Sequence, residues 1–329
     1  MFHGLYYRRS SNKAGLACGG RLAVAGTECL HGMAYQKALP NYLKILAGEV
    51  GPRFKSLDLS ERVTEAFTIL KDCELCSRRC RVDRTSGELG YCEAGDTAAV
   101  SSCFDHLGEE PFLVPSFTIF FKSCTFACLF CQNWEISQVG QTGADYYVTE
   151  SELAAAIDGH SYCRNVNFVG GEPTPWLPFI LKTLQYVKSD IPVVWNSNFY
   201  MSGKSMELLR GVVDVYLSDL KYGNDRCAAR LSDVPDYSRV VRENHLKAGQ
   251  DAELVIRHLV LPGHVDCCTR PVLQFIAENM GDRVVVNLMD QYRPCYKAHQ
   301  VSGLDRRITA EEFESCVDQA TRLGLNFIT

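Results

Sequence analysis

Three cysteines on one short segment are the residues of this chain with the clearest capacity for chemistry. Cys124, Cys128 and Cys131 follow the pattern Cys-x3-Cys-x2-Cys within eight residues. Three thiolates on one loop can bind three irons of a cubane iron–sulfur cluster. Such a cluster has four corners, and no cysteine follows closely beyond Cys131, so one iron is open to a ligand from outside the protein. Three buried or zinc-binding thiols are the alternative interpretation.

A second group of cysteines precedes this loop. Cys73, Cys76, Cys80 and Cys92 are separated by two, three and eleven residues. Closely spaced cysteines followed by a more distant one are typical of a closed tetrahedral metal site, which holds either zinc or a second iron–sulfur cluster. The spacing does not choose between the two metals, and reduced buried thiols are the alternative.

Arginines are interleaved with this second group of cysteines. Because acidic residues lie beside them, we expect a solvated face rather than a nucleic-acid contact. These arginines are Arg78, Arg79, Arg81 and Arg84. The other cysteines show no shared spacing, and we expect most of them to be core or surface thiols: Cys18, Cys29, Cys103, Cys163, Cys227, Cys267, Cys268, Cys295 and Cys316.

The composition is that of a globular protein, with 329 residues, 46% of them hydrophobic, and a net charge of −5. No apolar run is long enough for a membrane span or a signal peptide, and the mild acidity argues against a broad polyanion-binding surface. Sixteen cysteines without an export signal indicate the reducing cytoplasm, where clustered cysteines bind metal rather than form disulfides.

Apolar runs and helical patterns alternate from about residue 103 onward. Strands are predicted at 117–121, 165–169, 192–195, 212–217, 253–260 and 284–288, with a last strand at 325–328. Apolar helical faces lie between them, for example at 177–187 and 313–323. Repeated βα units of this kind predict a parallel sheet covered by helices.

We therefore expect an α/β fold, a partial TIM-type (β/α)6 barrel, with an open doubly wound sheet as the alternative. Polar or glycine-rich segments follow each predicted strand, and in barrels such segments meet at the carboxyl-terminal mouth. The expected division is an extension at 1–38, a helical and cysteine-rich metal-binding segment at 39–102, and the barrel at 103–329.

The cysteine loop, with Phe130 at the aromatic position before its last cysteine, resembles the radical S-adenosylmethionine (SAM) superfamily. The signature of that family is Cys-x3-Cys-x-aromatic-Cys, and the resemblance covers roughly residues 103–329. It implies a [4Fe–4S] cluster whose open iron binds the amino and carboxylate groups of SAM. In the family, the reduced cluster splits SAM to a 5′-deoxyadenosyl radical, which abstracts hydrogen from a substrate. The protein supplies orientation and the cofactor carries the hard chemistry.

The same resemblance implies a set of cofactor contacts after the next two strands. Two glycines let the backbone approach a ligand closely, and a carboxylate can accept from the ammonium group of SAM. Two asparagines alternate along a strand end and could bind ribose hydroxyls, or cap a turn. The matching residues are Gly170, Gly171, Glu172, Pro173, Asn196 and Asn198.

Candidates for catalysis follow later strands. Asp219 and Lys221 share a face, where a structural ion pair is the alternative to a catalytic role. One of Arg257 and His258 should point inward, and strand alternation alone does not say which. Tyr292 is expected near the substrate, with a packed aromatic as the alternative.

Further segments narrow the resemblance to PflX-type relatives of the pyruvate formate-lyase activating enzyme. These segments are Asp219-Leu-Lys221-Tyr and His258-Leu-Val-Leu-Pro-Gly, together with the stretch from Asn287 to Pro294. One departure weakens an activase assignment, because 107–111 reads Leu-Gly-Glu-Glu-Pro where activases carry a glycine-rich Asp-Gly-Pro-Gly type of segment.

The leading hypothesis is thus a radical SAM oxidoreductase, activating-enzyme-like, acting on a protein or peptide substrate. The resemblance implies a flavodoxin- or ferredoxin-type reductant and no membrane partner. A non-catalytic iron–sulfur electron carrier or scaffold is the alternative, and a zinc-dependent nucleic-acid-binding module is a third hypothesis that the acidic balance disfavours.

Overall fold

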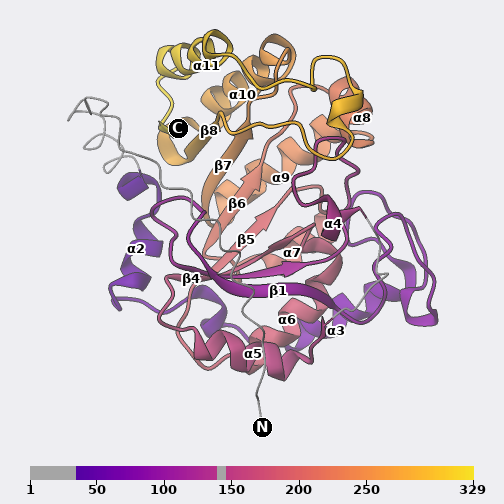
Figure 1. Ribbon diagram of the computed structural model, residues 1–329. Helices are drawn as coiled ribbons and strands as arrows, with labels where there is room; N and C mark the ends of the chain where they lie inside the picture. Colours follow the sequence, from indigo (N-terminus) through magenta and orange to yellow (C-terminus); the bar gives the residue numbers. More distant parts are fainter. Residues whose placement is uncertain (1–34, 139–145) are drawn as a thin grey trace, which may run out of the picture.

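One curved sheet of nine strands organises the chain in this computed structural model, which describes residues 35–138 and 146–329 (Figure 1). The strand order is β3-β1-β2-β4-β5-β6-β7-β8-β9. Neighbours from β2 to β9 run parallel, whereas β1 is antiparallel to both β2 and β3. The strands are β1 (Ala99–His106), β2 (Ser116–Phe121), β3 (Tyr146–Tyr147), β4 (Asn165–Gly170), β5 (Val193–Ser197), β6 (Val215–Asp219), β7 (Glu253–Leu259), β8 (Val285–Met289) and β9 (Phe327–Ile328).

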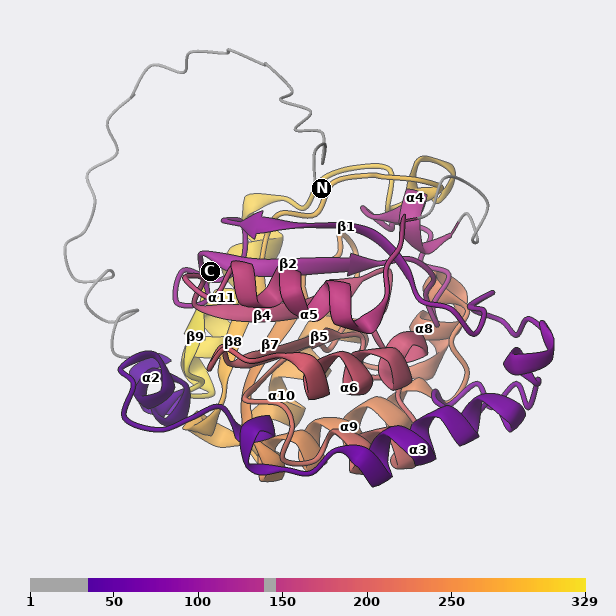
Figure 2. The same ribbon diagram turned by 90° about the horizontal axis from the view of Figure 1, so that it is seen from below.

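Helices follow the parallel strands and pack on the outer face of the curved sheet (Figures 1 and 2). The α-helices are α2 (Pro40–Leu46), α3 (Ser60–Ile69), α4 (Trp134–Ser137), α5 (Glu150–Gly159), α6 (Leu177–Tyr186), α7 (Gly203–Leu209), α8 (Asp225–Ser232), α9 (Tyr237–Asp251), α10 (Arg270–Asn279) and α11 (Ala310–Arg322). Short 3-10 turns are η1 (Arg53–Ser56), η2 (Leu70–Asp72), η3 (Arg84–Ser86), η4 (Thr174–Trp176), η6 (Gly281–Arg283) and η7 (Ala298–Gln300), and η5 (Val265–Thr269) is a π-helical turn.

Six parallel strands, β2 and β4 to β8, are each followed by a helix, and the described residues contain no pairing between the edge strands β3 and β9. The predicted partial (β/α)6 barrel is therefore confirmed. The strand expected at 212–217 begins later, at Val215. Val212 and Val213 are buried, but the N–H of Val212 closes a turn on Leu209 O at 2.9 Å. An apolar run alone does not mark where such a turn passes into the strand.

Both faces of the parallel strands are covered, which explains their nearly continuous apolar sequences. All five residues of β5 are buried. Alternate residues of the central strands, such as Val194, Val215 and Val255, form an inner cluster inside the curve of the sheet. The helices cover the outer face, so the sheet separates two apolar layers.

The segment that precedes the barrel in sequence packs directly on it. Leu39 and Tyr42, near and within α2, are fully buried and join the inner cluster at the base of the sheet. The amide of Asn165 in β4 donates to Tyr42 Oη at 2.9 Å and to Leu113 O at 2.7 Å. Helix α2 thus closes the amino-terminal end of the barrel.

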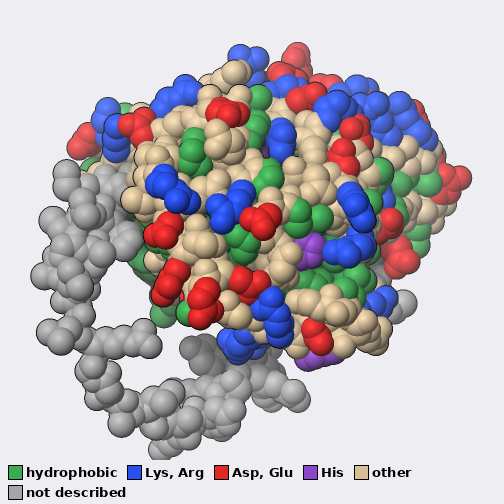
Figure 3. Space-filling model, turned by 90° about the horizontal axis from the view of Figure 1, so that it is seen from above, with side chains coloured by type: hydrophobic (Ala, Val, Ile, Leu, Met, Phe, Trp, Pro, Cys, Tyr) green, Lys and Arg blue, Asp and Glu red, His purple; other side chains and the backbone are tan. Residues whose placement is uncertain are grey.

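Two of the expected segment boundaries, at residues 38 and 103, can be compared with the structure. Strand β1 begins at Ala99, so it crosses the boundary expected at residue 103. The extension expected at 1–38 lies outside the described residues except for its last four. Within the described ranges, no helix is both long enough and apolar enough to cross a bilayer. On the face drawn in Figure 3, basic and acidic side chains are interspersed.

Replacing Tyr42 tests the closure of the barrel base. Tyr42→Phe should lower the free energy of unfolding by about 1 kcal/mol, because the Asn165 amide loses an acceptor. Tyr42→Ala should lower it by about 3–5 kcal/mol, because a cavity replaces a buried ring. Urea unfolding followed by circular dichroism measures both changes. The exposed Tyr186 is the control, and Tyr186→Ala should stay within about 0.5 kcal/mol of the wild type. Equal effects of Tyr42→Ala and Tyr186→Ala would contradict the closure.

Candidate functional site

The carboxyl-terminal ends of the parallel strands surround a cavity of about 960 Å³. Strand register brings their polar ends to one edge of the sheet: Ser197 pairs with Ser218, and Asp219 pairs with Arg257. Twelve of the candidate residues named from the sequence line this cavity: Cys124, Cys128, Phe130, Cys131, Gly170, Gly171, Glu172, Asn196, Asn198, Asp219, Lys221 and Arg257. Segments separated by almost 100 residues therefore share one space.

The cysteine loop follows β2 and is held by helix α8. The N–H groups of Ala127 and Leu129 donate to the last carbonyls of α8, on Ser232 and Leu231, both at 2.9 Å. The Ser232 hydroxyl also donates to Cys128 Sγ at 2.9 Å. The loop is thus fixed by its backbone and by one of its thiols.

Each of the other two thiols also has a hydrogen-bond partner. The N–H of Phe126 donates to Cys124 Sγ at 3.4 Å, and Ser137 Oγ lies 3.0 Å from Cys131 Sγ. Donors that point at sulfur stabilise thiolates and set the potential of an iron–sulfur cluster. This soft donor set on one cavity wall fits the implied cluster.

The three thiols need a cation to be held as thiolates. Burial raises the pKa of Cys124, and the negative charges of Glu172 and Cys128 raise it further. Burial raises the pKa of Cys128 to about 12, although Lys221 partly opposes this. Iron bound at the three sulfurs would supply the positive charge and reverse these shifts. A shared metal cluster is thus chemically suited to this loop.

Two glycines bring the end of β4 against the base of the cysteine loop. Gly170 has φ +128°, and a Cβ at this position would lie 2.1 Å from Phe121 O. A Cβ on Gly171 would lie 2.1 Å from Ser123 O. Both glycines are therefore required for backbone-to-backbone contact within the protein.

Glu172 is buried, and four donors surround its carboxylate. Thr174 donates to Oε1 from its N–H at 3.2 Å and from its hydroxyl at 2.5 Å, and Ser197 Oγ donates to Oε1 at 2.7 Å. The N–H of Asn198 donates to Oε2 at 2.9 Å. Burial raises the pKa of Glu172, and these hydrogen bonds oppose the shift. Each carboxylate oxygen offers about two lone-pair positions, and Oε2 accepts only one of these four hydrogen bonds, so one position remains on Oε2. The next residue, Pro173, does not line the cavity.

The two asparagines after β5 have different surroundings. Asn198 Nδ2 donates to Thr125 Oγ1 at 2.9 Å, and its Oδ1 accepts from the N–H of Tyr200 at 3.0 Å. Asn198 therefore ties the cysteine loop to β5. Asn196 Nδ2 is buried and has no partner among the described residues. A buried donor without a partner in a cavity wall fits a ligand oxygen such as a ribose hydroxyl.

Asp219 and Lys221 form an ion pair in the cavity wall. Lys221 Nζ donates to Asp219 Oδ2 at 2.6 Å. Burial lowers the pKa of Lys221, but the charges of Asp219 and Cys128 outweigh it and leave the pKa raised. Lys221 is therefore a fixed cation beside the cysteine loop.

His258 and Tyr292 lie outside the cavity lining. His258 is fully buried, with Nδ1 2.6 Å from Leu220 O and Nε2 2.9 Å from Thr269 Oγ1. Tyr292 is buried as well, donates to Leu304 O at 2.6 Å, and packs edge-on against Phe130. Both side chains pack and orient their neighbours.

The inward residue of β7 is Arg257, and it belongs to a buried network that the sequence did not reveal. Its Nε and Nη2 donate to Glu110 at 2.7 and 2.8 Å, and Nη2 also contacts Glu109. Asn287 Nδ2 donates to Glu110 Oε1 at 2.9 Å. Burial raises the pKa of Glu110, but the charge and hydrogen bonds of Arg257 and Asn287 leave it below its ordinary value. Two adjacent glutamates in an otherwise apolar stretch were the available sequence signal.

The segment that carries the second group of cysteines contacts the cysteine loop through Arg78 and Thr125, and none of its four cysteines lines the cavity. Burial raises the pKa of Cys76, and the thiols of Cys92, Cys73 and Cys80 add to the shift, so the four are electrostatic neighbours. Within residues 35–138 and 146–329, only one group of potential metal ligands has all its ligand atoms within 4.8 Å of one another, and it is a different group. A second metal site at these four cysteines stays a prediction.

Three of the remaining cysteines, which share no spacing in the sequence, lie together in the structure. Cys227, Cys267 and Cys268 meet at His264 and make up that compact group. Cys227 is separated by 37 residues from His264, so spacing along the chain did not connect them. The local signal was the short run His264-x2-Cys267-Cys268.

The solvated face expected for the arginines is wrong for two of them. Arg84 is 3% exposed and donates to Gly95 O and Pro175 O, each at 2.9 Å. Arg78 lies over the ring of Tyr91 and donates to Thr125 O at 3.0 Å. These two arginines join the cysteine-rich segment to the barrel.

This chain is similar in sequence to a known protein family and to two proteins of known sequence. A family model described as "Radical SAM superfamily" matches residues 118–276. The uncharacterized protein MJ0674 of Methanocaldococcus jannaschii is 48% identical over 277 residues, which are 83% of this chain and 80% of the relative. The uncharacterized protein MJ0808 of the same organism is 23% identical over 281 residues, 78% of this chain and 79% of the relative.

Solved structures with a similar fold were also found. SuiB of Streptococcus suis bound to S-adenosylmethionine is 16% identical, with a TM-score of 0.46, over 63% of this chain and 48% of SuiB. This chain therefore matches about half the length of SuiB. QueE of Escherichia coli is 13% identical, with a TM-score of 0.42, over 72% of this chain and 95% of QueE.

Replacing Gly171 tests the backbone contact beneath the cysteine loop. Gly171→Ala should destabilise the chain by about 3 kcal/mol, because the added Cβ overlaps Ser123 O. Reconstituted iron content should fall with it, since the displaced segment leads into Cys124. A Cβ on Gly159 would meet nothing within 4 Å, so Gly159→Ala is the matched control. Unchanged stability and iron content in Gly171→Ala would show that the contact is dispensable.

Proposed function

Because this chain belongs to the radical SAM superfamily, we propose that it cleaves SAM reductively at a [4Fe–4S] cluster and abstracts hydrogen from a protein or peptide. The observation that carries the proposal is one cavity that contains all three cysteines of the loop and the ends of the neighbouring strands. Cys124, Cys128 and Cys131 would hold the cluster, and the remaining iron would bind SAM. When bound, a reduced [4Fe–4S] cluster supplies the electron that breaks the sulfonium bond of SAM.

The chain's own residues would orient SAM around the cluster. Among the described residues, Asn196 offers a buried donor without a partner, and Glu172 retains one acceptor position. Lys221 supplies a fixed positive charge beside Cys128. Ligand pockets commonly measure about 300–1,000 Å³, so a cavity of this size leaves room for part of a second molecule.

The proposal extends to the class of substrate and to the reductant. The segments around Asp219 and His258 support an activating-enzyme-like role of the PflX type, including service as a glycyl-radical-enzyme activase, with a flavodoxin- or ferredoxin-type reductant. Glu109 and Glu110, which replace the activases' glycine-rich segment, hold Arg257 in the cavity wall. This charged network gives the cavity a polar side against which a peptide backbone could lie.

A second metal at Cys73, Cys76, Cys80 and Cys92 belongs to the same proposal. Its support is the mutual electrostatic influence of the thiols and the contact of Arg78 with the cysteine loop. None of the described cysteines forms a disulfide, and cysteines kept available for metals fit a reducing compartment such as the cytoplasm.

SAM cleavage is the direct test of the enzyme proposal. After anaerobic reconstitution, dithionite and SAM should yield 5′-deoxyadenosine from the wild type and none from the Cys124→Ala/Cys128→Ala/Cys131→Ala variant. Chromatography of the nucleoside products measures this. Metal retained by the triple variant and lost when Cys76 is also replaced by alanine would report on the second group of cysteines. An intact cluster without any 5′-deoxyadenosine would overturn the proposal.

Cys295 separates the enzyme from the electron-carrier alternative. Cys295 lies near enough to Cys131 to raise its pKa, yet it does not line the cavity. A carrier requires a fourth cluster ligand, and Cys295 is the nearby candidate. In the enzyme proposal, Cys295→Ser keeps both the cluster and 5′-deoxyadenosine formation. Loss of the cluster in Cys295→Ser would favour the carrier.

Isotope transfer tests the class of substrate. A deuterated candidate peptide or glycyl-radical protein should transfer deuterium into 5′-deoxyadenosine, because the abstracted atom ends on its 5′ carbon. Mass spectrometry of the nucleoside detects the transfer. Arg257→Lys should reduce the transfer while SAM cleavage without substrate persists, since the planar fork that engages Glu110 is lost. Deuterium from solvent alone, with every candidate protein and peptide, would contradict a protein or peptide substrate.

A further inference from the structure

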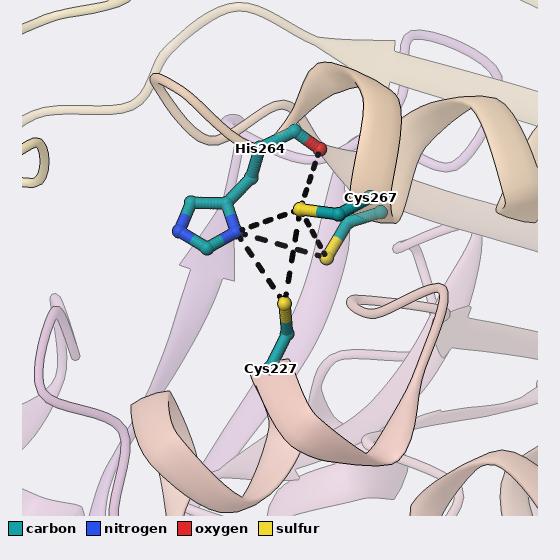
Figure 4. Close-up of side chains that lie close together, drawn as sticks. Cys227, His264 and Cys267 are labelled. Carbon is teal, nitrogen blue, oxygen red and sulfur yellow. Dashed lines mark hydrogen bonds between the residues drawn. The ribbon is translucent and has the colours of Figure 1, made fainter.

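Four potential metal ligands converge at the junction of two loops on the cavity side of the barrel. Cys227 lies in the first turn of α8, after β6. His264, Cys267 and Cys268 lie in and just before the π-helical turn η5, after β7. Figure 4 shows the His264 ring facing the sulfurs of Cys227 and Cys267. Cys267 is half-buried and the other three are buried.

Five of the six distances among these four atoms are close to the edges of a tetrahedron around one ion, and the sixth, between Cys227 Sγ and Cys268 Sγ, is within 4.8 Å. Cys267 Sγ lies 3.8 Å from Cys227 Sγ and 3.9 Å from Cys268 Sγ. His264 Nδ1 lies 3.6, 3.2 and 3.9 Å from the sulfurs of Cys227, Cys267 and Cys268. Zinc bonds of about 2.3 Å to sulfur and 2.0–2.1 Å to nitrogen place tetrahedral sulfurs about 3.8 Å apart, and sulfur and nitrogen about 3.6 Å apart.

The four-residue group fits neither a disulfide nor an iron–sulfur cluster as well as it fits a single ion. A disulfide requires sulfurs at about 2.05 Å, far closer than these. In a cubane cluster each thiolate binds a different iron, so its sulfurs lie farther apart than sulfurs that share one ion. Thiols are weak hydrogen-bond donors, so hydrogen bonding among them gives little reason for three to surround one imidazole.

The surrounding backbone holds the ligands in place before any ion binds. Asn224 Oδ1 accepts from the N–H of Cys227 at 2.8 Å, and its Nδ2 donates to Cys267 O at 2.7 Å. This one amide therefore joins the two segments that carry the ligands. A Cβ on Gly223 would lie 2.6 Å from Cys267 O, so only glycine allows this approach. Supports of this kind orient metal ligands.

From this geometry we propose that Cys227, His264, Cys267 and Cys268 bind one zinc ion in a closed structural site. Three thiolates and one neutral imidazole leave the loaded site with a net charge of −1. The Arg230 guanidinium, with Nη2 3.2 Å from His264 Nε2, offsets that charge. Because Arg230 can only donate, Nε2 accepts before loading and the ring proton is on Nδ1. On loading, Nδ1 binds the ion and the ring proton moves to Nε2, so the hydrogen bond from Arg230 is lost while its positive charge stays near the site.

The ion would act at a distance on the cysteine loop. Helix α8 carries Cys227 in its first turn and Ser232 at its end. Ser232 contacts both Ala127 N–H and Cys128 Sγ. An ion that fixes the start of α8 to η5 thereby fixes the part of the chain that positions Cys128.

Zinc content of the full chain, purified anaerobically under reducing conditions, tests the site independently of SAM cleavage. Cys227→Ser and His264→Ala should each contain about one zinc fewer per chain than the wild type. The difference is counted against the wild type, so any ion at Cys73–Cys92 cancels. Cys163→Ser is the matched control, because Cys163 is a buried thiol that contacts Asp105 away from these ligands.

His264→Cys keeps the test decisive if the other variants fail to fold. It should retain the zinc as a four-thiolate site, and after cobalt substitution its thiolate-to-cobalt absorption should shift relative to the wild type. The proposal is overturned if Cys227→Ser and His264→Ala keep the wild-type zinc content. It is also overturned if His264→Cys leaves the cobalt spectrum unchanged, if the lost metal is iron, or if mass spectrometry finds a Cys227–Cys267 disulfide.

Discussion

The cavity depends on one buried carboxylate. Glu172 accepts hydrogen bonds from the turn after β4 and from the end of β5, and so joins two strands at the point where their ladder ends. An unpaired buried charge would be expensive, and four donors offset that cost. Asn198, held by Glu172, in turn donates to Thr125 of the cysteine loop. A single chain of hydrogen bonds thus runs from the sheet to the cysteine loop.

This dependence explains why the glycines precede the glutamate directly. Gly170 and Gly171 bring the backbone of β4 against Phe121 and Ser123, and only then can Glu172 reach Ser197 and Asn198. The residues that allow close backbone packing, Gly170 and Gly171, therefore stand directly before Glu172, whose buried carboxylate receives the hydrogen bonds. Gly170, Gly171 and Glu172 thus join two strands to the cysteine loop, in addition to the cofactor contacts proposed for them.

Much of the fold and part of the site followed from local sequence. Parallel strands with both faces covered appear as apolar runs, and the three cysteines lie within one loop, so both features need no knowledge of distant contacts. Strand starts such as Val215 were less accessible, because buried turn residues carry the same apolar signal. Which of Arg257 and His258 points inward could not be read from the sequence, because the partners of Arg257 are the carboxylates of Glu109 and Glu110, almost 150 residues away. The grouping of Cys227 with His264 likewise arises only when α8 and η5 pack together.

The closed base of the barrel limits the routes by which a ligand could reach the cavity. Tyr42 and Leu39 fill the amino-terminal end of the inner space, whereas the cavity lies at the carboxyl-terminal ends of the strands. Under the proposed function, SAM and a substrate would therefore reach the cysteine loop past the cavity rim and not through the base. Leu39 and Tyr42 thus limit the routes into the cavity without lining it.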